Sequence, residues 1–301
     1  MTSGGSGMHG KAEKGKFVAA MVIFGTIGLL VKHIGLPSSV IALCRGVIGT
    51  LFLLVLMLVR GARFHGGAIG KNLPYLLLSG GALGFNWILL FESYRYISVA
   101  VSTLCYYLAP ILVILLSPVV THEPLTLKKG LCVAAALGGM VGLSGVLQGG
   151  AFRSGQGTGI LLGLAAAVLY AAIMLLNKRI QGLPALEKTI LQLGISAMVL
   201  LPYCLVTVRF SGLILSARPA VLLLVAGVVH TGLVYALYFD ALGAIPSQTA
   251  AIFSYIDPVV AVLTSVLLLR EPMPPSVGLG AVLILGAAVV SEVQLPVKGR
   301  K

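Results

Sequence analysis

Long apolar segments separated by short polar connections run through almost the whole chain. Each segment is close to the roughly 20 residues that an α-helix needs to cross the hydrocarbon core of a membrane. Apolar residues are continuous within the segments instead of alternating with polar ones, so the pattern predicts helices and not the strands of a barrel. The predicted transmembrane helices cover residues 17–33, 38–59, 73–94, 98–120, 126–146, 157–177, 186–208, 219–240, 246–269 and 276–293.

The second half of the chain repeats landmarks of the first half at a fixed offset of 148 residues. Each half holds five predicted helices, and because five is odd, the second half enters the membrane from the opposite side. The sequence therefore predicts an all-α membrane protein of ten transmembrane helices, built as two inverted five-helix repeats. The equivalent landmarks include Phe91 and Phe239, Tyr107 and Tyr255, Pro110 and Pro258, and Glu123-Pro124 and Glu271-Pro272.

Composition and charge agree with a chain whose solvent is mostly lipid. Hydrophobic residues make up 58% of the sequence and charged residues 10%, whereas soluble domains carry about 25% charged residues. The net charge of +13 does not indicate nucleic-acid binding, because the basic residues lie in short connections, where membrane topology requires them. Of the 21 Lys and Arg residues, 14 fall on the side of the N-terminus and six on the other side, with Arg45 inside a span.

This bias predicts a multi-pass membrane protein with both termini in the cytoplasm. The two repeats would occupy residues 17–146 and 157–293. We expect residues 1–16 to form a disordered cytoplasmic N-terminus, of which the first seven residues look artificial, and residues 294–301 to form a basic cytoplasmic tail. The sequence leaves the oligomeric state open.

A family resemblance rests on the repeat and on three local features. Arg45 lies early in the second span, Pro110 and Pro258 lie in the middle of the fourth and ninth spans, and a Glu-Pro pair follows each of these spans. In these features the chain resembles the drug/metabolite transporter superfamily with its EamA-type repeat, and within it the YddG-type exporters of aromatic amino acids. The resemblance implies a place in the inner (plasma) membrane of a bacterium, a central cavity, export of amino acids and tolerance of some toxic organic compounds.

Polar and aromatic side chains that recur on one face of several spans are candidates to line such a cavity, since polar groups in lipid must face a cavity or a partner. Trp87 and Tyr235 occupy equivalent positions in the two repeats. Helix packing is the alternative, because Gly80-x-x-x-Gly84 is also a close-approach motif. The candidates are Trp87, Tyr106, Tyr107, Tyr170, Gln192, Tyr203, His230, Tyr235, Tyr238, Tyr255 and Asp257.

Asp257 is the most informative of these residues, because it lies about halfway along a predicted span. An unpaired carboxylate there would be costly or would take up a proton. It can pair with a base such as His230 or Arg45, it can be protonated and hydrogen-bonded, or it can bind a substrate ammonium or a coupling proton. His230 is suited to a proton-coupled step, although a histidine on an apolar face can also be simply hydrogen-bonded.

The prolines and the remaining charges near the spans suggest moving parts. Pro110 and Pro258 each remove a backbone hydrogen bond and bend their helices, which makes them candidate hinges or static kinks. Arg45, Glu92 and Asp240 are candidates for a gate or a structural ion pair. The alternative for Arg45 is to bind a substrate carboxylate directly, and for the two carboxylates it is to be solvated helix ends.

Three classes of function follow, and the first is favoured. It is a secondary transporter that exports amino acids, aromatic and other neutral ones, by alternating access. The second is efflux of lipophilic cations or drugs, with or without proton coupling, in a cavity suited to cation–π contacts. The third is an intramembrane enzyme or a channel. No phosphate-binding loop, zinc-protease motif or nucleophile elbow occurs, so the sequence predicts no enzyme, no cofactor and no metal.

Overall fold

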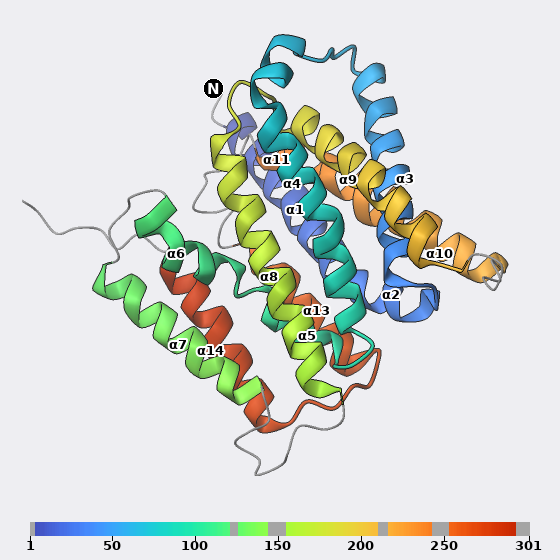
Figure 1. The fold of residues 1–301 in the computed structure, drawn as a ribbon. Coiled ribbons are helices and arrows are strands. Elements are labelled where there is room, and N and C mark those ends of the chain that lie inside the picture. The colour runs from blue at the N-terminus through green and yellow to red at the C-terminus, as the bar shows by residue number, and fades with distance from the viewer. Residues whose placement is uncertain (1–3, 121–125, 144–154, 210–215, 243–252, 293–301) are drawn as a thin grey trace, which may run out of the picture.

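The computed structural model describes residues 4–120, 126–143, 155–209, 216–242 and 253–292. Within these ranges all regular structure is helical (Figure 1). The predicted tail 294–301, Glu123-Pro124 and the first part of the predicted span 246–269 lie outside the described residues. The elements are α1 (Gly4–Gly25), α2 (Ile27–Ile34), α3 (Ser38–Val59), α4 (Gly66–Ser93), α5 (Val99–Tyr106), α6 (Ala109–Val120), α7 (Leu127–Leu143), α8 (Gln156–Arg179), α9 (Ala185–Thr207), α10 (Ala217–Gly227), the π-helix η3 (Val228–Leu233), α11 (Val234–Leu242), α13 (Ile256–Leu267) and α14 (Pro275–Glu292).

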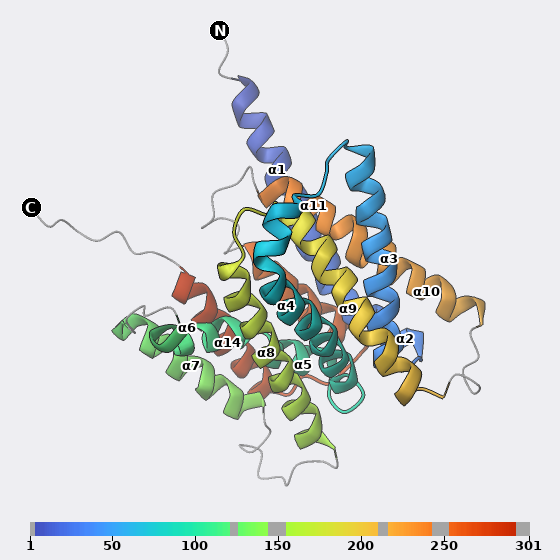
Figure 2. The ribbon, with the colours of Figure 1, turned by 45° about the horizontal axis from the view of Figure 1, so that its top comes forward.

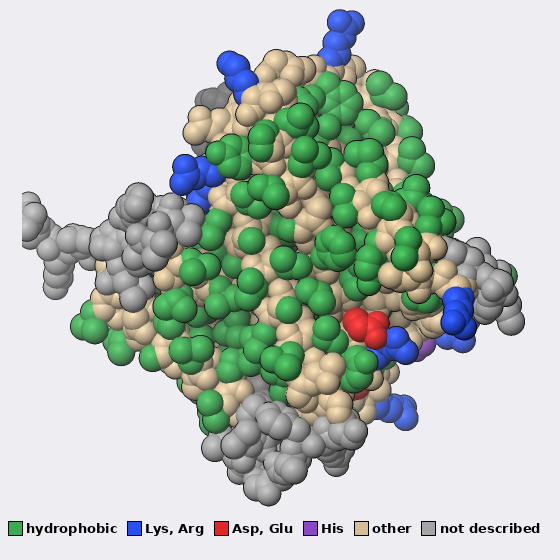
Figure 3. Space-filling view, in the orientation of Figure 1, with side chains coloured by type: hydrophobic (Ala, Val, Ile, Leu, Met, Phe, Trp, Pro, Cys, Tyr) green, Lys and Arg blue, Asp and Glu red, His purple; other side chains and the backbone are tan. Residues whose placement is uncertain are grey.

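Seven helical stretches of the described chain are long and apolar enough to cross a membrane. Two shorter apolar helices, Ile256–Leu267 and Pro275–Val290, accompany them. Hydrophobic side chains cover most of the face seen in Figure 3, and the Lys and Arg side chains visible there lie near its margins. The described part of the chain is thus all-helical, as in a multi-pass membrane protein, and the arrangement of ten spans in two inverted repeats stays a prediction.

Four of the predicted spans are irregular. The first is interrupted at Thr26, between α1 and α2, and the fourth at Tyr107 and Leu108, between α5 and α6. The eighth contains the π-helical turn η3, and the ninth has a turn at Tyr255 before α13 begins. The break after α5 and the turn at Tyr255 are each followed by a proline, Pro110 and Pro258, whereas the break at Thr26 and the π-helix η3 have no such signal in the sequence.

The N-terminal helix differs from the expectation of disorder through residue 16. Helix α1 begins at Gly4 and continues without interruption into the apolar stretch; Figure 2 shows its N-terminal part projecting beyond the other helices. Glu13 and Lys16 form an ion pair of 2.9 Å at i,i+3 spacing. Such pairs stabilise a helical turn, which helps the polar stretch to extend the helix.

Small residues set the helix contacts. Helix α7 lies with α14 at one side of the molecule (Figure 1), and a Cβ added at Gly139 would lie 2.8 Å from the carbonyl oxygen of Gly280. Helix α4 packs against α9 in the same way, since a Cβ at Gly80 would lie 2.7 Å from the Cβ of Ile195. The Gly80-x-x-x-Gly84 stripe therefore serves helix packing. Elsewhere α3 packs against α9, α4 against α8, α1 against α11 and α13, and α5 against α13.

Candidate functional site

A cavity of about 540 Å³ lies among α1–α5, α8, α9, α11 and α13. Pockets for small molecules commonly measure about 300–1,000 Å³. The cavity reaches the C-terminal half of α8 and the first turn of α9, where Asn177, Ala185 and Lys188 line it. The irregular points of the first, fourth and ninth spans also border it, through Gly25, Tyr107 and Tyr255.

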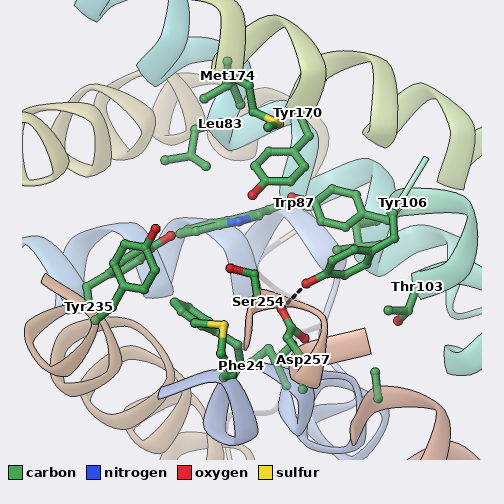
Figure 4. Close-up of a pocket in the computed structure, with 18 of the residues that line it drawn as sticks. Phe24, Leu83, Trp87, Thr103, Tyr106, Tyr170, Met174, Tyr235, Ser254 and Asp257 are labelled. Carbon is green, nitrogen blue, oxygen red and sulfur yellow. Dashed lines mark hydrogen bonds between the residues drawn. The ribbon is translucent and has the colours of Figure 1, made fainter. Parts of the chain in front are cut away.

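Aromatic rings form much of the cavity wall (Figure 4). Tyr106 and Tyr170 stack with their ring centroids 4.8 Å apart and their planes 10° from parallel. Phe24 meets Tyr235 edge to face at 5.3 Å. Together with Trp87 these rings surround Asp257 and Ser254 in Figure 4. The rings of the wall can stack against an aromatic ring of a ligand, or hold a ligand cation over their faces.

Asp257 supplies the carboxylate of the cavity. It lies in the first turn of α13, directly after the turn at Tyr255, and accepts a hydrogen bond from the Tyr107 hydroxyl (dashed line in Figure 4). Neither His230 nor Arg45 forms an ion pair with it, and no basic group does so in the part of the chain that the structure describes. Of the three interpretations of Asp257, pairing with a base is therefore not the one seen.

Arg45 supplies a positive charge at the cavity wall, where hydrogen bonds and aromatic rings hold its guanidinium. Its Nε donates to Thr231 Oγ1 at 3.1 Å and its Nη2 to the His230 carbonyl at 3.3 Å. The guanidinium carbon lies 4.2 Å from the centroid of the Trp87 ring and 5.3 Å from that of Phe91. The residue is 4% exposed, yet it lines the cavity. Both hydrogen bonds go to the π-helix η3, and π-helical turns are frequent at functional sites.

His230 lies behind this wall and not on the cavity surface. Its Nε2 and Thr26 Oγ1 are 3.0 Å apart, so the π-helix is tied to the break between α1 and α2. His230 is 7% exposed. The expectation that it faces the cavity is corrected, because the π-helical turn directs this side chain toward α1 while its carbonyl accepts from Arg45.

A polar group lies where the cavity meets the ends of α8 and α9. Gln192 donates from Nε2 to Asn177 Oδ1 at 2.7 Å and to Ser79 Oγ at 2.6 Å. Lys188 is half-buried beside them and lines the cavity. Its ammonium has no hydrogen-bond or ion-pair partner among the described residues. This end of the cavity therefore carries a positive charge.

Glu271 joins several helices at the end of the molecule opposite to Lys188. Its Oε1 pairs with Lys32 Nζ at 3.0 Å, and its Oε2 accepts from Ser265 Oγ at 2.6 Å and from the Val99 N–H at 2.8 Å. We call these four residues the Glu271 network. It ties α2 and the segment after α13 to the first residue of α5, where a carboxylate is favoured by the helix dipole.

The other charged candidates lie at helix ends. Glu92 pairs with Arg95 at 2.8 Å and accepts from Ser38 Oγ at 2.8 Å. Asp240 binds Arg60 through both oxygens, at 2.8 and 3.0 Å, and joins the ends of α11 and α3. The hydrogen bond to Asp240 raises the pKa of the Arg60 guanidinium above its ordinary value.

Comparison with known proteins identifies the family. The sequence model of the EamA-like transporter family matches residues 16–145 and, a second time, residues 157–292. The chain belongs to the EamA-like transporter family. Members of this family move small molecules across membranes, so this EamA-like chain is a transporter and not an enzyme.

Two further similarities agree with this assignment. An uncharacterized transporter, YxxF, of Bacillus subtilis (strain 168) is 32% identical over 249 residues, which cover 82% of this chain and 79% of that protein. A solved crystal structure matches with a TM-score of 0.65 at 20% identity and covers 93% of this chain and 97% of its own. At that identity the second similarity shows the fold alone.

Most of the predicted cavity residues of this EamA-like transporter do share one cavity. Tyr203 does not: it is 37% exposed and packs against Phe85 at 5.5 Å. It shares a helix face with Gln192, but Ser196 between them is covered by Gly84 of α4, so that face leaves the cavity before Tyr203. The predicted residues that line the cavity are Trp87, Tyr106, Tyr107, Tyr170, Gln192, Tyr235, Tyr238, Tyr255, Asp257, Pro110 and Arg45.

Several important positions were not among the predicted ones. Phe24 and Gly25 lie in a purely apolar stretch, and their place at the cavity depends on the break at Thr26, which has no proline beside it. Lys188 served only as a topology marker, and Glu271 only as a landmark of the repeat. Pro258 is buried away from the cavity.

Proposed function

We propose that this protein exports amino acids, aromatic and other neutral ones, across the bacterial inner membrane by alternating access between two inverted halves. The observation that carries the proposal is Asp257, a carboxylate without a basic partner among the described residues, in a cavity walled by aromatic rings. The carboxylate is suited to a substrate ammonium, and the rings are suited to an apolar or aromatic side chain.

The helix packing supports two inverted halves. Helix α4 packs against α8, and in the equivalent pair α11 packs against α1. Three further contacts, α3 with α9, α5 with α13 and α7 with α14, each join a predicted span to its own repeat equivalent. The double match of the family model to the chain points the same way. Halves related in this way can exchange conformations, which opens the cavity to one side and then to the other.

The asymmetry of the cavity supports one of these two states. It extends to the ends of α8 and α9, which the charge bias places in the cytoplasm, whereas the Glu271 network ties helices together at the other end. On this proposal the structure is the cytoplasm-facing state. The network would have to open before substrate could leave on the outer side.

The irregular helices support a substrate site at this depth. Non-helical backbone inside a membrane is tolerated where it is buried in protein or lines a cavity. Here the interruptions at Thr26, Tyr107 and Tyr255 lie beside the cavity or next to a residue that lines it. Transporters commonly bind their substrates at such discontinuous helices.

A specific observation also favours a second candidate, the efflux of lipophilic cations. Asp257 and the stacked pair Tyr106 and Tyr170 could hold a quaternary ammonium group by charge and by cation–π attraction. Such a substrate needs no carboxylate, and the two candidates therefore differ in a property that can be measured.

The test is transport by the purified protein in liposomes. Vesicles loaded with unlabelled amino acid would be assayed for uptake of labelled phenylalanine, of threonine and of a quaternary dication, with and without a pH gradient. We expect saturable amino-acid exchange that is lost in Asp257→Ala and Tyr235→Ala and kept in the matched control Tyr203→Ala, which removes an equal ring outside the cavity. Dication uptake driven by the pH gradient, without amino-acid exchange, would instead establish the second candidate.

A further inference from the structure

We infer that the cavity recognises a substrate carboxylate as well as its ammonium, and that Lys188 and Arg45 are the carboxylate-binding residues. The inference rests on the proposed function and deepens it, since it restricts the substrates to zwitterions with a free carboxylate. It would exclude amines and quaternary cations of the same size and apolar character.

The balance of charges that line the cavity is the first argument for this inference. Among the described lining residues three side chains are charged, Arg45, Lys188 and Asp257, so positive groups outnumber negative ones by two to one. No ion pair joins any two of them. Charges at membrane depth are costly without a partner. A substrate that brings both a carboxylate and an ammonium supplies partners for both signs, whereas a bare cation is attracted by Asp257 and repelled by the other two.

Arg45 carries the second step, because its guanidinium is held in place with donors to spare. Nε and Nη2 are engaged with η3, and the ring of Trp87 fixes the plane of the group. Nη1 has no hydrogen-bond partner in the described part of the chain. A planar guanidinium with free donors is suited to a carboxylate. Orientation by η3 and Trp87 reduces the entropy lost on binding.

Lys188 carries the third step, because it lies where a substrate would enter from the end formed by α8 and α9. It belongs to the first turn of α9, and its ammonium has no partner among the described residues. The neighbouring polar groups are already engaged, since Gln192 donates to Asn177 and Ser79. Lys188 is therefore the first charged group of the cavity that a substrate meets at this end, and a carboxylate is the group that it attracts.

The experiment compares probes that differ from phenylalanine in one charge. Phenylethylamine, phenylalanine amide and 3-phenylpropionate would compete with labelled phenylalanine in liposome exchange. We expect the two compounds without a carboxylate to compete about 10- to 100-fold less well than phenylalanine, since hydrogen bonds to charged groups have about that effect on affinity. 3-Phenylpropionate, which lacks the ammonium, should also be weak because of Asp257.

Variants of Lys188 test the assignment without disturbing the buried Arg45. Lys188→Gln should raise the half-saturation concentration of phenylalanine several-fold. It should make inhibition by phenylethylamine equal or stronger, because it removes a charge that repels the amine, and Lys188→Arg should keep both original values. Lys71→Gln is the matched control, because Lys71 is exposed on α4 and does not line the cavity. A folding defect would show as a loss for all probes alike, in which case the discrimination measured on the unaltered protein decides.

The outcomes separate this inference from the proposed function. Phenylalanine exchange with equally good competition by phenylethylamine would overturn the inference and leave amino-acid export standing. Unchanged discrimination in Lys188→Gln would overturn the role of Lys188. Absence of any amino-acid exchange, with uptake of a quaternary dication, would overturn both.

Discussion

Removal of the Glu271 carboxylate should release the end of the cavity opposite Lys188. The side chain is 14% exposed and accepts from Lys32, from Ser265 and from the Val99 N–H. If opening at this end separates α2, α5 and the segment after α13, these interactions exist only in the closed state. Glu271→Ala then destabilises the closed state relative to the open one.

The size of the effect follows from the number and kind of the lost interactions. Each hydrogen bond to a charged acceptor contributes about 1.5–3 kcal/mol, and Glu271 accepts two of them in addition to its ion pair. The Lys32 side chain is 30% exposed, so the ion pair adds at most about 1 kcal/mol. Water replaces part of this in the variant. A net change of about 3 kcal/mol shifts the ratio of the two states by roughly 150-fold.

The assay is the accessibility of the cavity to a thiol reagent that cannot cross the membrane. Thr103 lines the cavity, so Thr103→Cys in a background without the four native cysteines reports on opening. We expect Glu271→Ala to speed its modification from the Glu271 side by about 10- to 150-fold, and Glu271→Gln, which keeps an acceptor, by less.

Asp240→Asn is the control at the opposite end of the molecule, where the Arg60–Asp240 pair is more exposed. An exposed pair contributes about 0–1 kcal/mol, so the rate from the Glu271 side should hardly change. Equal modification rates in Glu271→Ala and the parent, in protein of unchanged thermal stability, would refute the assignment of the network as a closure. If Asp240→Asn sped up modification from the Glu271 side as much as Glu271→Ala does, the closure would not be specific to the Glu271 end.

Three further predictions concern stability and the site. Gly84→Ala should lower the thermal midpoint of unfolding, because its Cβ would lie 2.8 Å from a side chain of α9, whereas Gly81→Ala, with 4.0 Å of clearance, should raise it through helix propensity. Arg270 has a φ of 53°; Arg270→Gly should therefore be more stable than Arg270→Ala by about 1 kcal/mol in denaturant unfolding. Tyr107→Phe removes the donor to Asp257 and should change the half-saturation concentration for phenylalanine in liposome exchange while the thermal midpoint stays within a few degrees.

The sequence predicted the helices well, because continuous apolar runs of spanning length have one stable form in lipid. It did not predict the break at Thr26 or the π-helix η3. Both lie at close tertiary contacts. A Cβ at Gly25, beside the break, would lie 2.5 Å from the Asp257 carbonyl oxygen, and a Cβ at Gly232 of η3 would lie 2.5 Å from the ring of Phe52. Such close contacts between helices do not change the hydrophobic periodicity of the segments that make them, so the sequence does not reveal them.

The cavity was predictable where the repeat constrained it. Trp87 and Tyr235 are equivalent positions, and both line the cavity. Helical periodicity alone was less reliable, because it indicates a face and not how far along the helix that face stays open, as Tyr203 shows. The sequence did not indicate a role for Lys188 in the cavity, because a basic residue near a helix end is also expected from the orientation of the chain in the membrane. Its position fits both explanations equally well.

Two of the polar contacts that hold the irregular helices include a residue that lines the cavity, Arg45 or Asp257. The break at Thr26 is bonded to His230, the His230 carbonyl accepts from Arg45, and the turn after α5 is bonded through Tyr107 to Asp257. A substrate that binds Arg45 and Asp257 competes with or reinforces these bonds directly. A ligand shifts a conformational equilibrium only through its different affinity for the two states. On the proposed function, occupancy and hinge geometry thus depend on the same few atoms, so substitutions at the hinges should change substrate affinity and the rate of exchange together.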